Sequence, residues 1–354
     1  MSPPQVTVVL TCTASPMAVE AIQALQTSRA VRIRVVGVDM DPHGVGQRFA
    51  SAFYAVPAGN DPSYPEALLN ICRRESAQVV IPTSDEEALA LAQAAPRFQP
   101  HGVVCTVPRP ELVGCFSDKS RMYTVLAERG VPVPDHVQVT TVEGLREAAS
   151  RLGYPRRPFV IKPARARGGR GVWLVREGGA SLGELLGGVS LEAISLESLL
   201  SAIARAPEGM PPLVAMESFA GDVFDVDLLG VRGRLHTIIA RRRFHPRTTP
   251  FRGCVLERHE GVLALARSVQ EALALDYLHD VDIMLDRDGR AHLLEVNPRQ
   301  SASVIATVTA GVNLLELLIL RALDLELPPI EVPYGAVIRP SVRTTCLEAV
   351  GAVA

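Results

Sequence analysis

The sequence predicts a mixed α/β (α+β) protein, in which an open doubly wound domain is followed by a region of antiparallel sheets. Three observations support this prediction. Strand-like and helical segments alternate as far as about residue 115, a glycine-rich turn joins two apolar runs at residues 158–177, and strand-like runs follow one another from residue 213. Alternation indicates parallel strands connected by helices, whereas strands in direct succession indicate hairpins.

The composition is that of a globular protein with a small-molecule partner. The 354 residues are 47% apolar and 21% charged, with a formal net charge of −2. This charge offers no attraction to nucleic acid or to an anionic membrane, so neither is an expected partner. The sequence has no signal-peptide pattern and no apolar run near the roughly 20 residues that span a bilayer, which predicts a cytoplasmic protein. The six cysteines are scattered without a C-x-x-C pair, which argues against a zinc site or a disulfide framework.

Residues 1–115 are expected to form the doubly wound domain. The predicted elements are strands at residues 6–11 and 31–38, helices at residues 16–27 and 64–75, a strand over QVVIPT, a helix over EEALALAQAA and a strand over GVVCTV. The first turn, TCTASP, lacks the G-x-G-x-x-G of dinucleotide sites, although Asp39 closes the second predicted strand. A nicotinamide or flavin site is therefore the less favoured alternative.

Residues 116–212 form the second predicted unit. Ser117 and Asp118 are suited to cap a helix over SRMYTVLAERG, and a Pro-rich connector, VPVPDH, follows. A helix over VEGLREAASRLG then leads to the strand PFVIKPA, the turn RARGGRG and the strand VWLVRE, and a last helix is expected over LEAISLESLLSAIARA. The strand, glycine-rich turn and strand indicate a hairpin, unlike the strand-to-helix P-loop.

Residues 213–354 form the third predicted unit, which is rich in antiparallel strands. Strands are expected over LVAMESF, DVFDVDLLGV and RLHTIIARRRF, with the turn VRGR between the last two. A helix at residues 260–275 precedes a hairpin over DVDIMLDRDGRAHLLEVN, whose turn is at DRDG. The most polar part of an otherwise apolar strand lies at the end of this hairpin.

Three polar side chains alternate with apolar ones at that end. Glu295, Asn297 and Arg299 stand at every second position of LLEVNPRQSAS, so they point the same way if the segment is extended. Asp282 lies on the first strand of the hairpin, where it can face Glu295. Two carboxylates and an amide oxygen are hard ligands suited to Mg²⁺, with Mn²⁺ as an alternative ion. A solvated polar strand face is the alternative interpretation.

Two further features favour a phosphate-binding site. Only two of the 36 basic residues are lysines, Lys119 and Lys162. Lysine differs from arginine where a compact point charge is needed, which suggests a specific role for these two residues. The alternative is that lysine was retained at these two positions by chance. Lys162 ends an apolar strand just before the glycine-rich residues 167–171. Glycines let backbone N–H groups approach phosphate oxygens. Together with the acidic hairpin, these features predict a nucleoside triphosphate site.

These motifs resemble, in their order, those of the ATP-grasp superfamily. The resemblance is carried by SDKS, FVIKPARARGGRG, AMESF, Asp282 and EVNPR, covers about residues 110–320, and is greatest toward single-module relatives of the carbamoyl-phosphate synthase large subunit and toward carboxylate-amine ligases. It implies a pre-ATP-grasp domain at 1–115, a small lid subdomain at 116–212 and a large subdomain with the metal site at 213–354.

The resemblance also implies roles for individual residues. Lys119 and Lys162 would contact ATP phosphates, and Arg299 would face the transferred phosphoryl group, which makes Lys162 and Arg299 the candidate catalytic residues. The other implied residues are Gly168, Gly169 and Gly171 in the lid, Glu217, Ser218 and Phe219 around adenine and ribose, and Asp282, Glu295 and Asn297 at Mg²⁺. Val223 stands where many members have an acidic residue, so the implied ribose contact there is in doubt.

The implied activity is phosphorylation of a carboxylate by ATP, followed by attack of an amine on the acylphosphate. A carbamoyl-phosphate-synthase-like kinase acting on bicarbonate or carbamate, and a non-catalytic ATP-binding regulatory protein, are the alternatives. The planar guanidinium group of arginine can bind a carboxylate substrate through two hydrogen bonds, and serine hydroxyls can line the acceptor pocket. The candidate substrate-binding residues are Arg241, Arg243, Arg252, Ser301 and Ser303. A solvated strand edge and simple packing explain these residues equally well. A homodimer agrees with the resemblance.

Overall fold

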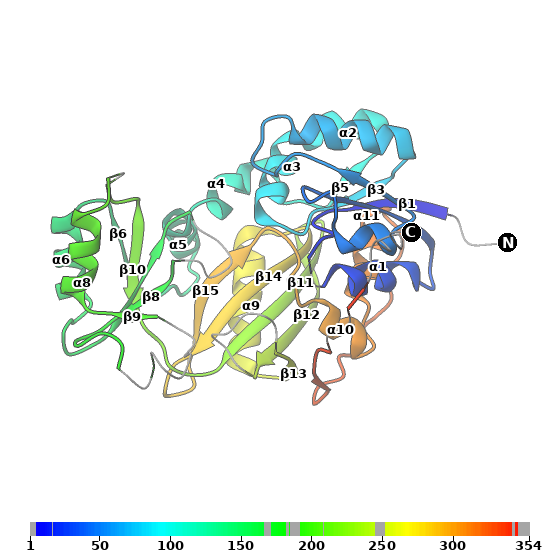
Figure 1. The fold of residues 1–354 in the computed structure, drawn as a ribbon. Helices are drawn as coiled ribbons and strands as arrows, with labels where there is room; N and C mark the ends of the chain where they lie inside the picture. The colour runs from blue at the N-terminus through cyan, green and yellow to red at the C-terminus, as the bar shows by residue number, and fades with distance from the viewer. Residues whose placement is uncertain are drawn as a thin grey trace, which may run out of the picture.

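The computed structural model describes residues 5–15, 17–165, 171–181, 184, 192–207, 209–244, 252–341 and 344–345. Within this part of the chain the strands form three sheets, of five, five and six strands. Figure 1 shows the second sheet at one end of the molecule and the third sheet between it and the first. None of the described helices is long and apolar enough to cross a membrane.

The first sheet is parallel throughout and has the order β3-β2-β1-β4-β5. Its strands are β1 (Gln5–Leu10), β2 (Arg32–Asp39), β3 (Ala52–Ala55), β4 (Val79–Ile81) and β5 (Val104–Cys105). The helices are α1 (Ala18–Gln26), α2 (Tyr64–Glu75) and α3 (Asp85–Phe98), with the short helices η1 (Val45–Arg48), η2 (Gln99–His101), η3 (Pro110–Leu112) and α4 (Val113–Phe116). The predicted doubly wound fold is thus confirmed, and the strand order reverses between β1 and β4.

Local side-chain contacts fix two turns at the carboxyl end of this sheet. The Asp39 carboxylate accepts the N–H of Ala14 (2.7 Å) in the loop after β1 and the N–H of Asp41 (2.9 Å) in the turn after β2, so it holds these two segments together. Helix α3 begins with a capping box, in which Ser84 accepts the N–H of Glu87 and the Glu87 side chain reaches back to Ser84. This cap places Asp85 in the first turn of α3, at the edge of the sheet.

The second sheet has the order β6-β10-β7-β8-β9. It contains β6 (His136–Val139), β7 (Phe159–Pro163), β8 (Trp173–Val175), β9 (Ala193–Ile194) and β10 (Leu213–Glu217), and its region includes α5 (Lys119–Glu128), α6 (Val142–Arg151) and α8 (Leu196–Ala204). Apolar side chains of α6 and α8 pack with those of the strands in one core cluster. The predicted glycine-rich hairpin is confirmed, because β7 and β8 pair antiparallel.

Two expectations about this region are corrected, and one strand, β6, was not predicted. Residues 213–217 were expected in the third unit, but their strand pairs with β7 and β6 and so belongs to the second sheet. The residues after the Pro-rich connector form the strand β6. The expected helix over residues 191–206 begins only at Leu196, because the Ser195 side chain accepts the N–H of Ser198 and caps the helix there.

The third sheet is antiparallel, with the order β15-β14-β11-β12-β13-β16. Its strands are β11 (Val223–Val231), β12 (Arg234–Arg243), β13 (Cys254–Leu256), β14 (Tyr277–Leu285), β15 (Ala291–Asn297) and β16 (Val337–Ile338). The associated helices are α9 (Glu260–Leu273), α10 (Ile305–Thr309) and α11 (Leu314–Ala322). Helix α9 packs on β11, β12 and β15, whereas α11 lies between β14 and α1 of the first unit.

The first and third sheets share their cores. Ile22 and Leu25 of α1 belong to the same buried cluster as Leu315 and Leu318 of α11. A polar contact reinforces this packing, since Glu316 Oε1 accepts hydrogen bonds from Ser28 Oγ and from the N–H groups of residues 29 and 30. The two sheets therefore form one packed body. The five cysteines in the described residues carry free thiols.

Candidate active site

The β14–β15 hairpin brings Asp282 opposite Glu295, as the sequence predicts. The pairing shifts by one residue directly after this pair, so Leu294 is an extra residue in β15. Such a bulge re-aims the backbone. The Leu294 carbonyl oxygen accepts hydrogen bonds from Tyr123 Oη (2.6 Å) and from Lys162 Nζ (3.1 Å). The bulge therefore connects the acidic hairpin to one of the two lysines.

Lys162 is buried and connects the second sheet to the third through its contact with the Leu294 carbonyl. It is the penultimate residue of the apolar strand β7 and is only 6% exposed. Its Nζ also donates to Tyr123 Oη (3.1 Å) and lies 5.4 Å from the centre of the Tyr123 ring. Burial lowers the pKa of Lys162, and the carboxylates of Glu295 and Asp282 oppose this shift.

Lys119 contacts the same hairpin from a different element, helix α5. It is the first residue of α5, which begins there because the Asp118 carboxylate accepts the N–H groups of Ser120 and Arg121. Lys119 Nζ lies 2.9 Å from Glu295 Oε1. The fold thus brings the only two lysines of the chain to β15 from separate elements.

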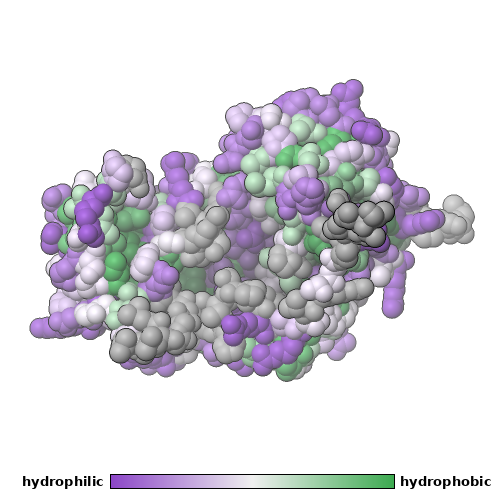
Figure 2. Space-filling view, in the orientation of Figure 1, coloured by the Kyte–Doolittle hydropathy of each residue, from purple (hydrophilic) through white to green (hydrophobic). Residues whose placement is uncertain are grey.

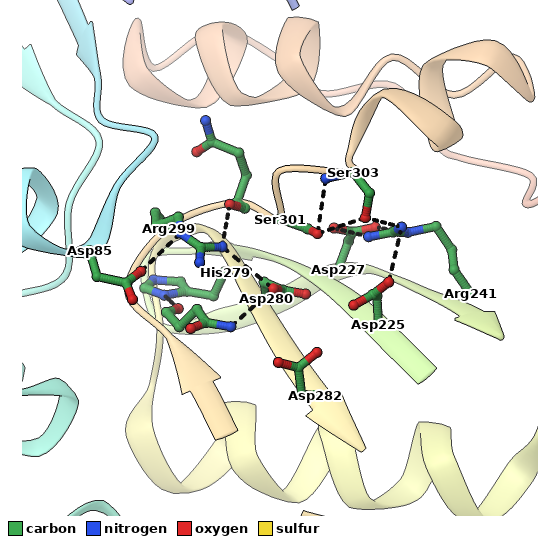
Figure 3. A network of polar contacts seen from close by, with 12 residues as sticks. Asp85, Asp225, Asp227, Arg241, His279, Asp280, Asp282, Arg299, Ser301 and Ser303 are labelled. Carbon is green, nitrogen blue, oxygen red and sulfur yellow. Dashed lines mark hydrogen bonds and ion pairs between the residues drawn. The ribbon is translucent and has the colours of Figure 1, made fainter. Parts of the chain in front are cut away.

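Three acidic side chains of β11 and β14 lie beside this hairpin. One carboxylate oxygen from each of Asp225, Asp280 and Asp282 lies within 4.8 Å of the others, and Figure 3 shows these three side chains on neighbouring strands. Arg243 bridges two of them, with Nε 2.9 Å from Asp225 Oδ1 and Nη2 2.5 Å from Asp282 Oδ1. Burial raises the pKa of Asp282 to about 7, and burial and neighbouring carboxylates raise the pKa of Asp280.

The donor set around Asp280 fits a hard divalent cation. Among the described residues, no hydrogen-bond partner reaches Asp280 Oδ1, although the side chain is buried. Asn297 Nδ2 donates to Asp280 Oδ2 (3.0 Å), which leaves the Asn297 amide oxygen available for another contact. Carboxylate and amide oxygens are the ligands that Mg²⁺ takes in proteins. Sequence reasoning missed Asp225 and Asp280, although the D-x-D spacing at 225/227 and 280/282 was visible.

Arg299 lies where the first and third sheets meet. Its Nε lies 2.9 Å from Asp85 Oδ1 of α3, and its Nη1 lies 3.5 Å from Asp280 Oδ2. Nη1 also donates to the carbonyl oxygen of Gln300 (2.8 Å). The guanidinium group is therefore held between a carboxylate of the first unit and one of the acidic strands (Figure 3).

Arg241, Ser301 and Ser303 form a buried network, which favours a structural role over the expected contact with substrate. The Arg241 side chain is 0% exposed. It donates from Nε to Asp227 Oδ2 (2.7 Å) and from Nη1 to Ser303 Oγ (2.8 Å), while Ser303 Oγ lies 2.9 Å from Ser301 Oγ. These contacts fix the loop that follows β15 and carries Arg299.

Replacement of Asp227 by alanine is expected to lower the free energy of unfolding by about 3 kcal/mol, because Arg241 would keep a buried charge with a weaker partner. Denaturant titration measures this change. Glu66→Ala is the matched control: Glu66 of α2 pairs with Arg97 at the surface, where both side chains are more than half exposed, so a loss below about 1 kcal/mol is expected. Equal losses in the two variants would contradict the structural role of Arg241.

The residues expected around adenine lie where β10 ends. Glu217 Oε1 accepts the N–H of Asp135 (2.9 Å), and Ser218 Oγ donates to the carbonyl oxygen of Pro158 (2.9 Å). The Phe219 ring stacks on the ring of His292 with centres 4.0 Å apart. Figure 2 shows the surface hollowed between the regions of the first and second sheets, with hydrophilic side chains gathered there.

The glycine-rich turn, Arg252 and Val223 are the remaining positions named from the sequence. Gly171 has a φ of +71°, which favours glycine, whereas Gly168 and Gly169 lie outside the described residues. Arg252 is exposed, and its carbonyl oxygen accepts a hydrogen bond from Arg339 (3.2 Å). Val223 is buried at the start of β11.

Comparison with curated proteins shows similarity to carbamoyl phosphate synthase large chains. The chain is 27% identical over 173 residues to that of Streptomyces avermitilis, a match covering 48% of this chain and 14% of the relative. It is 23% identical over 260 residues to that of Methanosarcina barkeri, covering 69% of this chain and 22% of the relative. The chain thus matches only a small part of the length of these relatives.

Solved structures share the fold at low identity. N5-carboxyaminoimidazole synthetase from Staphylococcus aureus, complexed with ADP, has a TM-score of 0.69 at 16% identity, with 94% of this chain and 81% of that chain covered. The biotin carboxylase domain dimer of Hydrogenobacter thermophilus 2-oxoglutarate carboxylase, in complex with MgADP, ADP and bicarbonate, has a TM-score of 0.68 at 16% identity, covering 93% and 72%. L-amino acid ligase from Bacillus licheniformis has a TM-score of 0.61 at 16% identity, covering 92% and 75%.

Two family models match successive parts of the chain. Residues 9–106 match the model described as PylC-like, N-terminal domain. Residues 209–345 match the model described as ATP-grasp in the biosynthetic pathway with Ter operon. The chain therefore has an ATP-grasp family domain, preceded by a PylC-like N-terminal domain.

Proposed function

We propose that this protein is an ATP-dependent ligase that joins a small carboxylate to an amine through an acylphosphate, with release of ADP and phosphate. The observation that carries the proposal is the convergence of both lysines on the acidic hairpin: Lys119 Nζ lies 2.9 Å from Glu295 Oε1, and Lys162 Nζ donates to the Leu294 carbonyl (3.1 Å). Cations fixed beside acidic metal-binding groups are suited to hold and polarise phosphates.

In this proposal the chain's own residues bind and orient the nucleotide. Lys119 and Lys162 hold the phosphates, and the lid glycines Gly168, Gly169 and Gly171 close over them. Glu217, Ser218 and Phe219 hold adenine and ribose. Buried lysines have few alternative rotamers, so they keep the terminal phosphate in place without much further loss of entropy on binding.

A magnesium ion would be held by Asp282, Glu295 and Asn297, with Asp280 beside them, because these residues offer the hard oxygen donors described above. When bound, the ion supplies neutralisation of the phosphate charge. Arg299 faces the transferred phosphoryl group from the side of the first unit. Its delocalised charge stabilises the three phosphoryl oxygens as the bond to ADP breaks.

The substrates in this proposal are a small-molecule carboxylate and an amine. A carboxylate is a poor acyl donor, and its phosphorylation supplies a good leaving group for attack by the amine. Arg243 is partly exposed and Arg252 is exposed, so they are the better candidates for carboxylate recognition, whereas Arg241 is buried. A homodimer stays a prediction.

A second candidate function is a kinase acting on bicarbonate or carbamate. The observation that favours it is the similarity to carbamoyl phosphate synthase large chains. The biotin carboxylase domain with a similar fold was also solved with bicarbonate. Both candidates require the same nucleotide site, so the acceptor alone distinguishes them.

ADP release by the purified protein with Mg²⁺ and ATP is expected to rise at least about tenfold with one carboxylate and its amine partner, because phosphoryl transfer needs the acceptor in place. A coupled assay over a panel of amino acids and other carboxylates measures this rise, and mass detection identifies the product. A response to bicarbonate alone would favour the second candidate. Nucleotide binding without stimulation by any acceptor would contradict both.

A further inference from the structure

Asp85, a residue of the first unit, forms an ion pair with the predicted catalytic residue Arg299. It lies in the first turn of α3, is 5% exposed, and its Oδ1 lies 2.9 Å from Arg299 Nε. The turn before it is rigid, since Thr83 donates from its N–H to Thr11 Oγ1 (3.0 Å) and from its Oγ1 to the Thr11 carbonyl (2.8 Å). Asp85 is therefore a fixed anchor.

A chain of contacts runs from this anchor to the predicted metal ligands. Arg299 Nη1 lies 3.5 Å from Asp280 Oδ2, and the same oxygen accepts the hydrogen bond from Asn297 Nδ2 (3.0 Å). Figure 3 shows Arg299 lying between Asp85 and Asp280. The ion pair with Asp85 competes with Asp280 for the guanidinium group and so limits how far Arg299 turns toward Asp280.

We propose that Asp85 is a positioning residue, which holds Arg299 in the orientation that receives the terminal phosphoryl group of ATP. This inference rests on the proposed function of Arg299. Without the Asp85 carboxylate, the guanidinium group would turn to the nearest remaining carboxylate, that of Asp280, and would leave the phosphoryl position. Small displacements of a catalytic group are costly, on the order of 100-fold in rate.

The alternative is that Asp85 only fastens the first unit to the third. The structure offers a matched control for this alternative, because Glu316 makes a comparable contact between the same two units through Ser28 Oγ (2.7 Å) and neighbouring N–H groups, away from Arg299. A purely structural role predicts similar consequences for Asp85→Asn and Glu316→Gln.

Calorimetric binding of two nucleotides to the full chain tests the proposal. Asp85→Asn is expected to weaken binding of the non-hydrolysable ATP analogue AMP-PNP with Mg²⁺ by about tenfold and to change binding of MgADP by less than about twofold, since Arg299 contacts only the terminal phosphoryl group. Asp85→Glu keeps the charge, so it is expected to retain most of the AMP-PNP affinity of the unaltered protein. Glu316→Gln is expected to bind both nucleotides as the unaltered protein does. Thermal unfolding confirms that each variant is folded.

A double-mutant cycle shows whether Asp85 acts through Arg299. In an Arg299→Lys background, Asp85→Asn is expected to weaken AMP-PNP binding by less than about twofold. An undiminished effect there, or equal weakening of both nucleotides, would overturn the proposal. If the unaltered protein binds both nucleotides but shows no acceptor-stimulated ADP release, the proposed ligase function is wrong. The comparison of AMP-PNP and MgADP binding in the Asp85 variants still decides the role of Asp85 in that case. If the unaltered protein binds neither nucleotide, both proposals fall.

Discussion

Glu295→Gln is expected to reduce acceptor-stimulated ADP release by about 100-fold or more at saturating ATP and Mg²⁺, a loss typical of removing one group that stabilises transition-state charge. The substitution keeps the shape of the side chain but removes its charge opposite Asp282 and beside Lys119. The concentration of Mg²⁺ needed for half-maximal activity should also rise, because a neutral amide is a weaker ligand than a carboxylate. Steady-state kinetics at varied Mg²⁺ measures both effects.

Glu257→Gln is the control for this substitution. Glu257 also pairs with a cation of the third sheet, through Oε2 2.7 Å from Arg242 Nε, but it lies outside the predicted site. Its loss should leave ADP release within about twofold, since exposed ion pairs contribute little. Retained turnover in Glu295→Gln, with a normal unfolding transition, would count against the metal and phosphate assignment.

Periodicity and turn chemistry predict much of the fold. The β14–β15 hairpin follows from two apolar runs around DRDG, and the structure closes it as expected, with the Asp286 carboxylate accepting the N–H groups of Asp288 and Arg290. Periodicity does not say which sheet a strand joins. The strand β10 looks like its successors in sequence, yet it pairs with β6 and β7. That choice depends on long-range packing, which local patterns do not encode.

Helix α11 shows a second limit of prediction from sequence. Its segment, LLELLILRA, is apolar on nearly every side and has no counterpart among the predicted elements. The structure buries it between α1 and β14. A segment that is covered on all faces lacks the amphipathic pattern by which helices are recognised.

Within the site, the sequence predicts residues whose chemical type is unusual for their setting. Lys119 and Lys162 stand out because lysine is rare in this chain, and Glu295 because it interrupts an apolar strand. Arg241 and Arg243 look equivalent in sequence, yet Arg241 is buried against Asp227 and Arg243 bridges Asp225 and Asp282. Asp85 gives no signal, because an acidic residue at a helix start is ordinary and its partner lies more than 200 residues away.

Lys162→Met is expected to lower acceptor-stimulated ADP release by about 100-fold or more while changing the free energy of unfolding by less than about 1 kcal/mol. Methionine has a similar length and can fill the same buried space. Burial already disfavours the charged form of Lys162, as its lowered pKa indicates, so removing that charge need not destabilise the fold. The Leu294 carbonyl oxygen stays paired, because Tyr123 Oη donates to it at 2.6 Å.

Kinetics and denaturant titration on the same preparation separate catalysis from stability in this variant. Arg205→Met is the control: Arg205 closes α8 in the same region and donates only to the Ser201 carbonyl (3.1 Å) in its described contacts, so its loss should change neither quantity appreciably. Lys162→Arg should not restore activity, because a planar guanidinium group is larger than an ammonium group and Lys162 is buried. Full turnover in Lys162→Met would mean that Lys162 only supports packing, and the phosphate contact would then have to come from Lys119 alone.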